Sequence, residues 1–341
     1  MITLATLLVL PLWAAAQEAN SPSLTASSNA PGQVLLADGG QPILQYNARR
    51  VELPDGYWEK LSEANRIYAK PRSGYLHPLY GLDGEELTLD WSEDHPHHRG
   101  IYWAWPEVQF GERTADLHAL QGVYSRPVGE PLLTNGDGFA RVEAKNLWLW
   151  EDEAPVVFER VVITAHALDA DGTRTIDLDL RFEALAGGVS LARRGTNLYG
   201  GLNTRLAPVE GLKFGHRPGP TASGVSDVVA EPLEGHATQT FGWSTTTGTW
   251  KNGKRRTTLA ILEHPTNPDF PADFITYEYL PWFQPTFPRA DTRFALEPGR
   301  PLVLNYRFVI LAGEAEVKAL DAACERFAKD KNISPRPDSD D

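Results

Sequence analysis

The segment TIDLDLRFE, residues 175–183, alternates apolar with polar or charged side chains at every position. Successive side chains of a strand point to opposite faces, so Ile176, Leu178, Leu180 and Phe182 share one face and the polar residues share the other. The preceding run VVFERVVITAHA, residues 156–167, is also typical of a strand, and Asp171-Gly172 between the two runs is a hairpin signal. The pattern predicts an antiparallel pair with one buried face and one solvated face.

Strand-like segments recur along the whole chain, and turn residues separate almost all of them. No strand–helix–strand spacing of about 30 residues and no repeat period is visible, which argues against a parallel α/β sheet or a propeller. We therefore expect an all-β protein, a large antiparallel β sandwich. The further predicted strands are 43–46, 66–69, 85–89, 101–105, 140–150, 238–244, 257–263 and 302–311.

One convincing helix is predicted, over residues 314–329. Val317, Leu320, Cys324 and Phe327 fall on one of its faces at helical spacing. We expect this short C-terminal helix to be the longest in the protein and to cap the edge of the sandwich.

The two ends of the chain differ in composition from its middle. Residues 1–16 form an apolar run that ends in Ala14-Ala15-Ala16, which predicts a signal peptide and a secreted or periplasmic protein. Residues 17–32 are small and polar, which predicts a flexible leader, and residues 331–341 are charged and Pro-containing, which predicts a disordered tail. Residues 33–330 remain as a single β-sandwich domain, and no later segment is long and apolar enough for membrane insertion.

Charge and composition narrow the class of partner. A formal net charge of −13 repels polyanions, so we expect the protein to bind neither nucleic acid nor an anionic membrane surface. The single Cys324 excludes disulfides and thiolate zinc clusters. Indole faces suit sugar rings, and nine of the ten Trp follow the signal peptide, so a carbohydrate is the expected partner. The oligomeric state is left open.

The candidate chemistry is concentrated between residues 77 and 105, which hold four of the nine His. If His95-Pro96-His97 is extended, His95 and His97 point to one side and His98 to the other. The favoured interpretation is a metal-free acid/base site in which a His transfers a proton, a carboxylate is its counterpart and Arg99 holds the substrate. The predicted catalytic residues are His77, Asp94, His97, His98, Arg99 and Glu263.

Two other interpretations of the histidines stay open. Imidazoles at i and i+2 can bind Zn, Mn or Cu, which makes His95 and His97 the ligands if a metal is present. Arg99 opposes this, because it places a fixed positive charge beside the cluster unless it points away. No cofactor is expected in the favoured interpretation, and a divalent metal is the alternative. In the third interpretation the His and Arg side chains only satisfy carbonyl groups of the loop.

Substrate-binding residues are predicted in the same stretch and on two further segments. Arg205 together with Arg99 could hold the carboxylate of a uronate through bidentate hydrogen bonds. Tyr80, Trp103 or Trp105 could stack on a sugar ring. The segment EHPTNP, residues 263–268, follows an apolar strand and places Glu263, His264 and Asn267 on a rigid turn at a sheet end. Glu263 is the candidate general base there.

Several motifs resemble a known bacterial family. They are HPLYGLDG at 77–84, DHPHHRG at 94–100, YGGLNTR at 199–205, EHPTNP at 263–268 and LNYRFVI at 304–310. The chain resembles the PmoA family, a domain of unknown function that carries a methane-oxygenase-like label. That label implies several membrane-spanning helices, which this sequence lacks, so a methane oxygenase is not expected. The resemblance implies a galactose-mutarotase-like supersandwich of the kind that accompanies glycan degradation, in which His and carboxylate side chains act on sugars.

The sequence therefore predicts an exported carbohydrate-active enzyme. We expect it to cleave or isomerise a glycan or a uronate-containing sugar by His/carboxylate acid/base catalysis, as a glycoside hydrolase, lyase or epimerase. One alternative is a non-catalytic glycan-binding protein. Another is a metal-dependent hydrolase or lyase that acts on an oxidised sugar.

Overall fold

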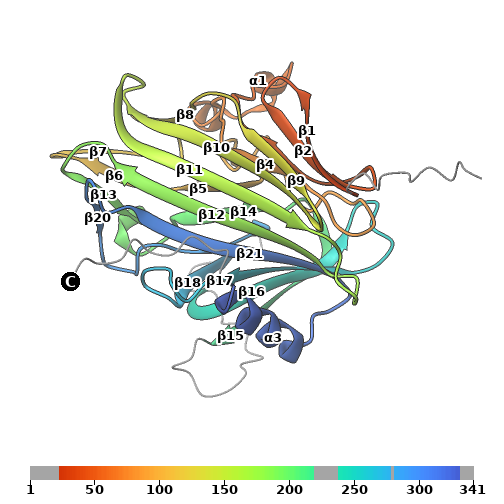
Figure 1. Ribbon diagram of the computed structural model, residues 1–341. Coiled ribbons are helices and arrows are strands. Elements are labelled where there is room, and N and C mark those ends of the chain that lie inside the picture. Colours follow the sequence, from red (N-terminus) through yellow and green to blue (C-terminus); the bar gives the residue numbers. More distant parts are fainter. Residues whose placement is uncertain (1–22, 219–236, 278–279, 331–341) are drawn as a thin grey trace, which may run out of the picture.

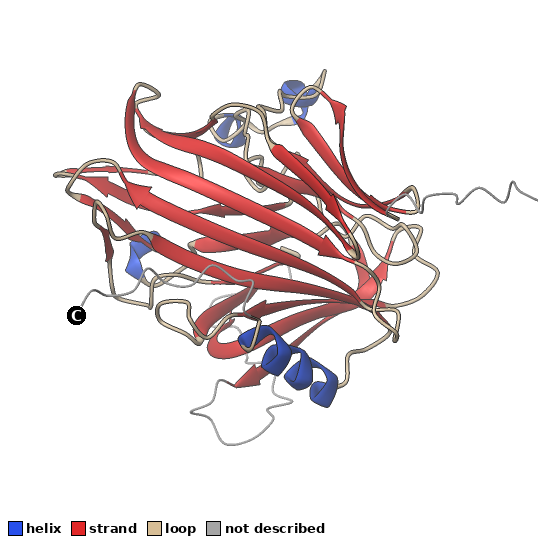
Figure 2. Ribbon diagram, in the orientation of Figure 1, coloured by secondary structure: helices blue, strands red, loops and turns tan. Residues whose placement is uncertain are grey.

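The computed structural model describes residues 23–218, 237–277 and 280–330. These residues form an all-β protein, a large antiparallel sandwich with a short C-terminal helix, as the alternation predicts (Figure 2). The predicted signal peptide and the predicted tail lie outside the described residues. No helix in the described part of the chain has the length and apolar character needed to cross a membrane.

The first layer contains the long strands that lie in front in Figure 1. Each strand is hydrogen-bonded to the next one in an antiparallel ladder, and β8 and β9 share the outer edge of β10. In order across the layer the strands are β8 (Val123–Pro127) and β9 (Leu132–Gly136), β10 (Phe139–Trp150), β11 (Ala154–His166), β12 (Arg174–Ala184), β21 (Leu302–Ala312), β17 (Thr257–Glu263), β16 (Ala237–Trp250) and β15 (Val209–Pro218).

The second layer is built in the same way and shares strand β16 with the first. The beginning of β16 pairs with β18 and its later part pairs with β17, so one strand passes from layer to layer. In order across this layer the strands are β1 (Leu24–Ala30), β2 (Gln33–Asp38), β3 (Gln41–Asn47), β4 (Tyr75–Leu79), β5 (Ile101–Ala104), β14 (Gly201–Arg205), β19 (Trp282–Pro285) and β18 (Ala272–Tyr277).

The remaining elements are short. A four-stranded sheet contains β7 (Arg113–Ala115), β6 (Glu107–Phe110), β13 (Val189–Ala192) and β20 (Phe294–Leu296). The helical segments are α1 (Tyr57–Lys60), α2 (Glu63–Arg66), the 3₁₀ turn η1 (Arg194–Thr196) and α3 (Val317–Ala328).

Strand β12 shows how the sequence pattern produces the core. Ile176, Leu178, Leu180 and Phe182 are at most 1% exposed and face the interior between the layers. The opposite face is not simply solvated, because Asp177 is buried and its carboxylate accepts hydrogen bonds from Arg307 and His166 on the two neighbouring strands. Some of the polar residues that alternate with the core residues of β12 are therefore buried in ion pairs between strands rather than exposed to solvent.

Helix α3 is the longest helix, as predicted, but it does not cap an edge. Its residues Leu320 and Phe327 pack on Trp243, Leu262 and Val309 of β16, β17 and β21. The helix therefore covers the outer surface of the first layer (Figure 1).

Three local predictions were wrong. Residues 24–30 of the predicted flexible leader form β1, because Leu24 and Ala26 are buried in the core and the backbone pairs with β2. Residues 66–69 are not a strand, because Arg66 ends helix α2 and a turn follows. Residues 85–89 make only isolated bridges, Tyr80 with Glu86 and Thr88 with Leu206.

Candidate functional site

The motif DHPHHRG folds into a tight turn. The backbone N–H of His98 donates to the carbonyl of His95 at 2.9 Å. The turn stacks the His95 and His98 rings at 4.6 Å between centroids, and His97 lies 4.5 Å from His98. The extended conformation considered for His95–His97, in which His98 points away from His95 and His97, does not occur, because the chain bends at Pro96 and His97.

A histidine from another loop joins this turn. His118 lies between Asp116 and Gln121, whose backbones exchange hydrogen bonds of 2.8 and 2.7 Å. One ring nitrogen from each of His97, His98 and His118 lies within 4.8 Å of the others, and we call these three residues the histidine cluster. Zinc–nitrogen bonds of about 2.0–2.1 Å place two tetrahedral ligand atoms about 3.4 Å apart, so the rings need to close by little more than an ångström to share an ion.

The outer face of the second layer lies beneath the histidine cluster. Tyr102 on β5 is paired with Asn203 on β14, and Arg205 on β14 is paired with Trp282 on β19. The Tyr102 hydroxyl lies 2.9 Å from Nε2 of His118, and the Trp282 ring lies 4.5 Å from the His98 ring. Paired strands present directly opposite residues on one face, so the sheet holds this polar and aromatic platform in a fixed arrangement.

The imidazoles of the histidine cluster are held in the neutral form. Burial, followed by the neighbouring His95 and Arg72, lowers the pKa of His97 to about 3. Burial also lowers the pKa of His98 and of His118 well below the ordinary histidine value, and the other histidines of the cluster add to the effect. Neutral imidazoles keep a nitrogen lone pair, which is the form that binds a metal ion.

Two ion pairs neutralise the arginines that border the histidine cluster. Nη2 of Arg205 donates to both oxygens of Asp94, at 3.0 and 2.8 Å, and Arg194 pairs with Asp116. Burial raises the pKa of Asp94, but hydrogen bonds from His95 and the charge of Arg205 outweigh it and hold that pKa well below its usual range. Nδ1 of His95 lies 3.3 Å from Oδ2 of Asp94. The half-exposed Asp94 and His95 therefore form the solvent side of the site.

Arg72 anchors the loop that carries His118. This buried guanidinium donates to the carbonyls of Leu117 and His118 and lies over the Tyr102 ring. Among the residues that the structure describes, no carboxylate lies within ion-pair distance of Arg72.

Aromatic rings surround the histidine cluster. Tyr68 lies 4.8 Å from His97, Tyr199 lies 5.0 Å from His118, and Trp282 lies 5.6 Å from Tyr199, all between ring centroids. Tyr68 and Tyr199 are partly exposed, whereas Trp282 is buried. Partly exposed rings and the half-exposed side chains of Asp94 and His95 therefore border the histidine cluster.

Two residues of the same motifs are not in the site. Arg99 is completely buried, pairs with Asp90 and Tyr75, and stacks on Trp91 with its guanidinium 3.4 Å from the ring centroid. His77 bonds through Nδ1 to Thr88 Oγ1 at 3.0 Å rather than to any histidine of the cluster. The predicted catalytic set, which combined His77 and Arg99 with His97 and His98, is not brought together, because Arg99 pairs with Asp90 in the interior and His77 bonds to Thr88.

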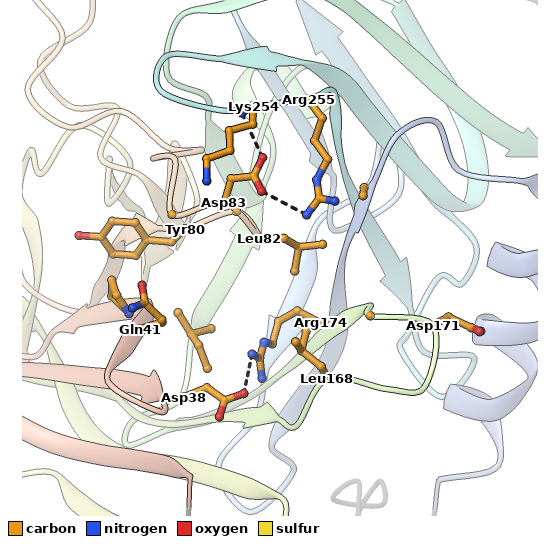
Figure 3. A pocket seen from close by; sticks show the side chains of 16 residues that line it. Asp38, Gln41, Tyr80, Leu82, Asp83, Leu168, Asp171, Arg174, Lys254 and Arg255 are labelled. Atoms are coloured by element: carbon orange, nitrogen blue, oxygen red, sulfur yellow. Dashed lines mark hydrogen bonds and ion pairs between the residues drawn. The ribbon is translucent and has the colours of Figure 1, made fainter.

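The predicted sugar-stacking aromatics are also elsewhere. Trp103 follows Tyr102 on β5 and therefore points the opposite way, into the core, and Trp105 is core as well, with Nε1 donating to Phe287 O at 2.7 Å. Tyr80 lines a separate cavity, shown in Figure 3.

The EHPTNP turn is structural. The Asn267 side chain donates to Asn305 O at 2.9 Å and accepts from Asn305 N at 2.7 Å, which ties the turn to β21. The His264 ring packs on Phe327 of α3, 4.9 Å between centroids. Glu263 is buried, and its carboxylate accepts the backbone N–H of Ala272 at 2.7 Å. None of the three predicted roles in catalysis or substrate binding at this turn fits these contacts.

Several residues of the site were missed by the sequence interpretation, among them Tyr68, Tyr102, His118, Tyr199 and Trp282. Tyr102 could have been found, because the alternation that makes Trp103 a core residue places Tyr102 on the other face. His118, Tyr199 and Trp282 carry no such local signal, since each reaches the site through a contact between segments far apart in the sequence.

Comparison with known families gives one match, which covers most of the chain. A family model described as "Family of unknown function (DUF6807)" matches residues 33–325. A comparison with curated proteins finds no match. The predicted similarity to the PmoA family is not tested by this match and stays a prediction.

Proposed function

Because the chain belongs to the DUF6807 family, whose function is unknown, we propose its activity from the site itself: a metal-dependent carbohydrate-active enzyme. In this proposal His97, His98 and His118 hold one divalent transition-metal ion. The enzyme acts as a hydrolase or lyase on a sugar, with an oxidised sugar as the preferred class.

The observation that carries the proposal is the set of three neutral imidazoles with mutually close nitrogens. Nδ1 of His97 and Nδ1 of His98 are both buried without a hydrogen-bond partner in the described part of the chain. Buried polar atoms normally have a partner, and an exception calls for an explanation such as an ion. Three protein nitrogens with a position left open are the ligand set typical of catalytic zinc.

The position of Arg99 removes the main objection to a cation. Its charge is neutralised by Asp90 in the interior, so it does not face the histidine cluster. Arg194 and Arg205 are each paired with a carboxylate. The contact between Tyr102 and His118 is the kind of outer hydrogen bond that orients a metal-binding imidazole.

The groups around the cluster suit a hydroxylated substrate. Nε and Nη1 of Arg205 and Nε1 of Trp282 are buried donors with no partner among the described residues, and in this proposal substrate oxygens would pair with them. Partly exposed Tyr68 and Tyr199 offer rings to a sugar face. A bound metal would polarise a carbonyl or activate a water molecule. His95, oriented by Asp94 at the solvent side, would carry the proton to or from the substrate.

Metal analysis tests this proposal directly. Mature protein dialysed against a chelator should rebind about one equivalent of Zn²⁺, Mn²⁺ or Cu²⁺, followed by calorimetry and elemental analysis. His118→Gln should weaken this binding at least about 100-fold, because it removes one of three ligands. His166→Gln is the matched control, since its imidazole pairs with Asp177 outside the site. Failure of the wild type to bind any of these ions, or equal binding by the two variants, would contradict the proposal.

Turnover separates this activity from the two other interpretations. A panel of glycans and keto-sugars should show turnover that a chelator abolishes and added metal restores. Turnover that survives complete metal removal would favour the metal-free His/carboxylate mechanism. Sugar binding without turnover across the panel would favour a non-catalytic glycan-binding protein.

A further inference from the structure

A cavity of about 540 Å³ lies apart from the histidine cluster, and none of its lining residues belongs to that cluster. The β2–β3 turn, the segment after β4, the β11–β12 hairpin and the β16–β17 turn form its walls (Figure 3). We call it the Tyr80 cavity. Its size falls in the range of small-molecule sites, roughly 300–1,000 Å³.

Ion pairs fix the walls of the Tyr80 cavity. Asp83 pairs with Arg255 at 3.1 Å and accepts the backbone N–H of Lys254 at 3.0 Å. On the other side Nη2 of Arg174 donates to Asp38 at 2.8 Å (Figure 3). Nη1 of Arg174 donates to His166 O at 2.6 Å. Both carboxylates are therefore neutralised within the wall.

Three polar groups of the cavity are left for a ligand. In the described part of the chain no hydrogen bond or ion pair engages the Lys254 ammonium, the Gln41 amide or the Tyr80 hydroxyl. The remaining acid, Asp171, points away from these three side chains in Figure 3. One positive charge with two neutral hydrogen-bonding groups therefore faces the cavity.

The other lining groups are apolar. Leu82 and Leu168 contribute to the wall, and Leu168 is 46% exposed. The Tyr80 ring adds an aromatic surface that suits the C–H face of a sugar. Apolar walls with a few convergent polar groups are characteristic of ligand sites. A single free cation matches a single carboxylate, whereas a polyphosphate or nucleic acid would meet the overall charge of −13.

We propose that the Tyr80 cavity is a second ligand site, which binds a sugar-sized monocarboxylate such as a uronic acid, free or at the end of an oligosaccharide. Lys254 pairs with the carboxylate, Gln41 and the Tyr80 hydroxyl bond to ring hydroxyls, and the Tyr80 ring and Leu168 contact the apolar face. The site goes beyond the proposed metal-dependent activity, because it uses none of the histidines.

Calorimetry on the mature protein with D-glucuronate, D-galacturonate and D-glucose tests this site. The wild type should bind a uronate and bind glucose at least about 10-fold more weakly, because a hydrogen bond to a charged group discriminates by about that factor. Lys254→Met should weaken uronate binding by a similar factor. Lys251→Met is the matched control, since this exposed lysine lies in the same turn and does not line the cavity. A glucuronate-ended disaccharide that binds more tightly than the free acid would indicate an oligosaccharide end as the natural ligand.

Any one of three results would overturn the proposal. They are absence of uronate binding, equal affinity for glucose and glucuronate, and equal effects of the two lysine variants on uronate binding. His118→Gln should retain uronate affinity at the Tyr80 cavity even where it loses metal. This outcome distinguishes failure of the second site from failure of the metal-dependent function.

Discussion

Replacing Glu263 by glutamine should make the stability of the protein less dependent on pH. Glu263 ends β17 and is 4% exposed, and its carboxyl group contacts Ala272 N and, at 3.4 Å, Asn267 Nδ2. Burial raises the pKa of Glu263 from 4.5 to about 8, although these two hydrogen bonds lower it in part. Glutamine keeps the shape and an acceptor for Ala272 N–H but cannot ionise.

The sign and the size of the effect follow from this pKa. A carboxyl group whose pKa is raised in the folded state contributes stability that is fully present below the unfolded pKa and is lost as the pH rises through the folded pKa. The loss is about 1.4 kcal/mol per pH unit between the two values. From pH 5 to pH 7 the wild type should therefore lose about 2.5 kcal/mol of unfolding free energy through Glu263. The glutamine variant should lose none through this position, so its stability relative to wild type rises by that amount.

Urea unfolding followed by tryptophan fluorescence at pH 5, 6 and 7 measures this difference. Glu112→Gln, at an exposed turn between β6 and β7, is the control for the loss of one negative charge. Its effect should change little over the same range. If the difference between Glu263→Gln and wild type is the same at pH 5 and pH 7, the carboxyl group is ionised in the folded protein and the reasoning is refuted.

Two further predictions concern contacts around the site. Arg99→Met should lower the unfolding free energy by about 3–5 kcal/mol, because it leaves Asp90 buried without its cation, whereas Arg113→Met at an exposed ion pair should cost less than about 1 kcal/mol; equal urea midpoints for the two variants would show that Arg99 is not a structural residue. Tyr102→Phe should weaken metal binding by about 10- to 100-fold, because it removes the hydroxyl that orients His118; a competition assay with a chromogenic chelator measures this, and an unchanged affinity would count against the proposed role of Tyr102.

The fold class was predictable because it depends on local alternation. Each of Ile176, Leu178, Leu180 and Phe182 is buried for a reason that a nine-residue window contains, and the same holds for most of the predicted strands. Predictions from local patterns were wrong where the same residues can form a different element of secondary structure. Residues 66–69 contain the last residue of a short helix with a Ser62 N-cap and the turn after it. Residues 24–30 become a strand because they pair with β2.

The location of the site was predictable in part. The His-rich motif does supply His97 and His98, and the YGGLNTR motif supplies Arg205. The choice between neighbouring residues was not predictable from composition. Arg99 and His98 are adjacent, yet one pairs with Asp90 in the interior and the other joins the histidine cluster.

The sequence by itself determined that this chain forms an antiparallel β sandwich and that its longest helix is at the C-terminal end, and it predicted a candidate site within residues 77–105. Hydrophobic periodicity and turn residues act over a few positions, so they can be read without the fold. Only the tertiary structure decided which polar groups meet: Arg205 reaches Asp94 across 111 residues, and His118 reaches His97 from another loop. Such contacts depend on strand order and register across two layers. The sequence alone does not give strand order or register, so the distances between loops cannot be inferred from it.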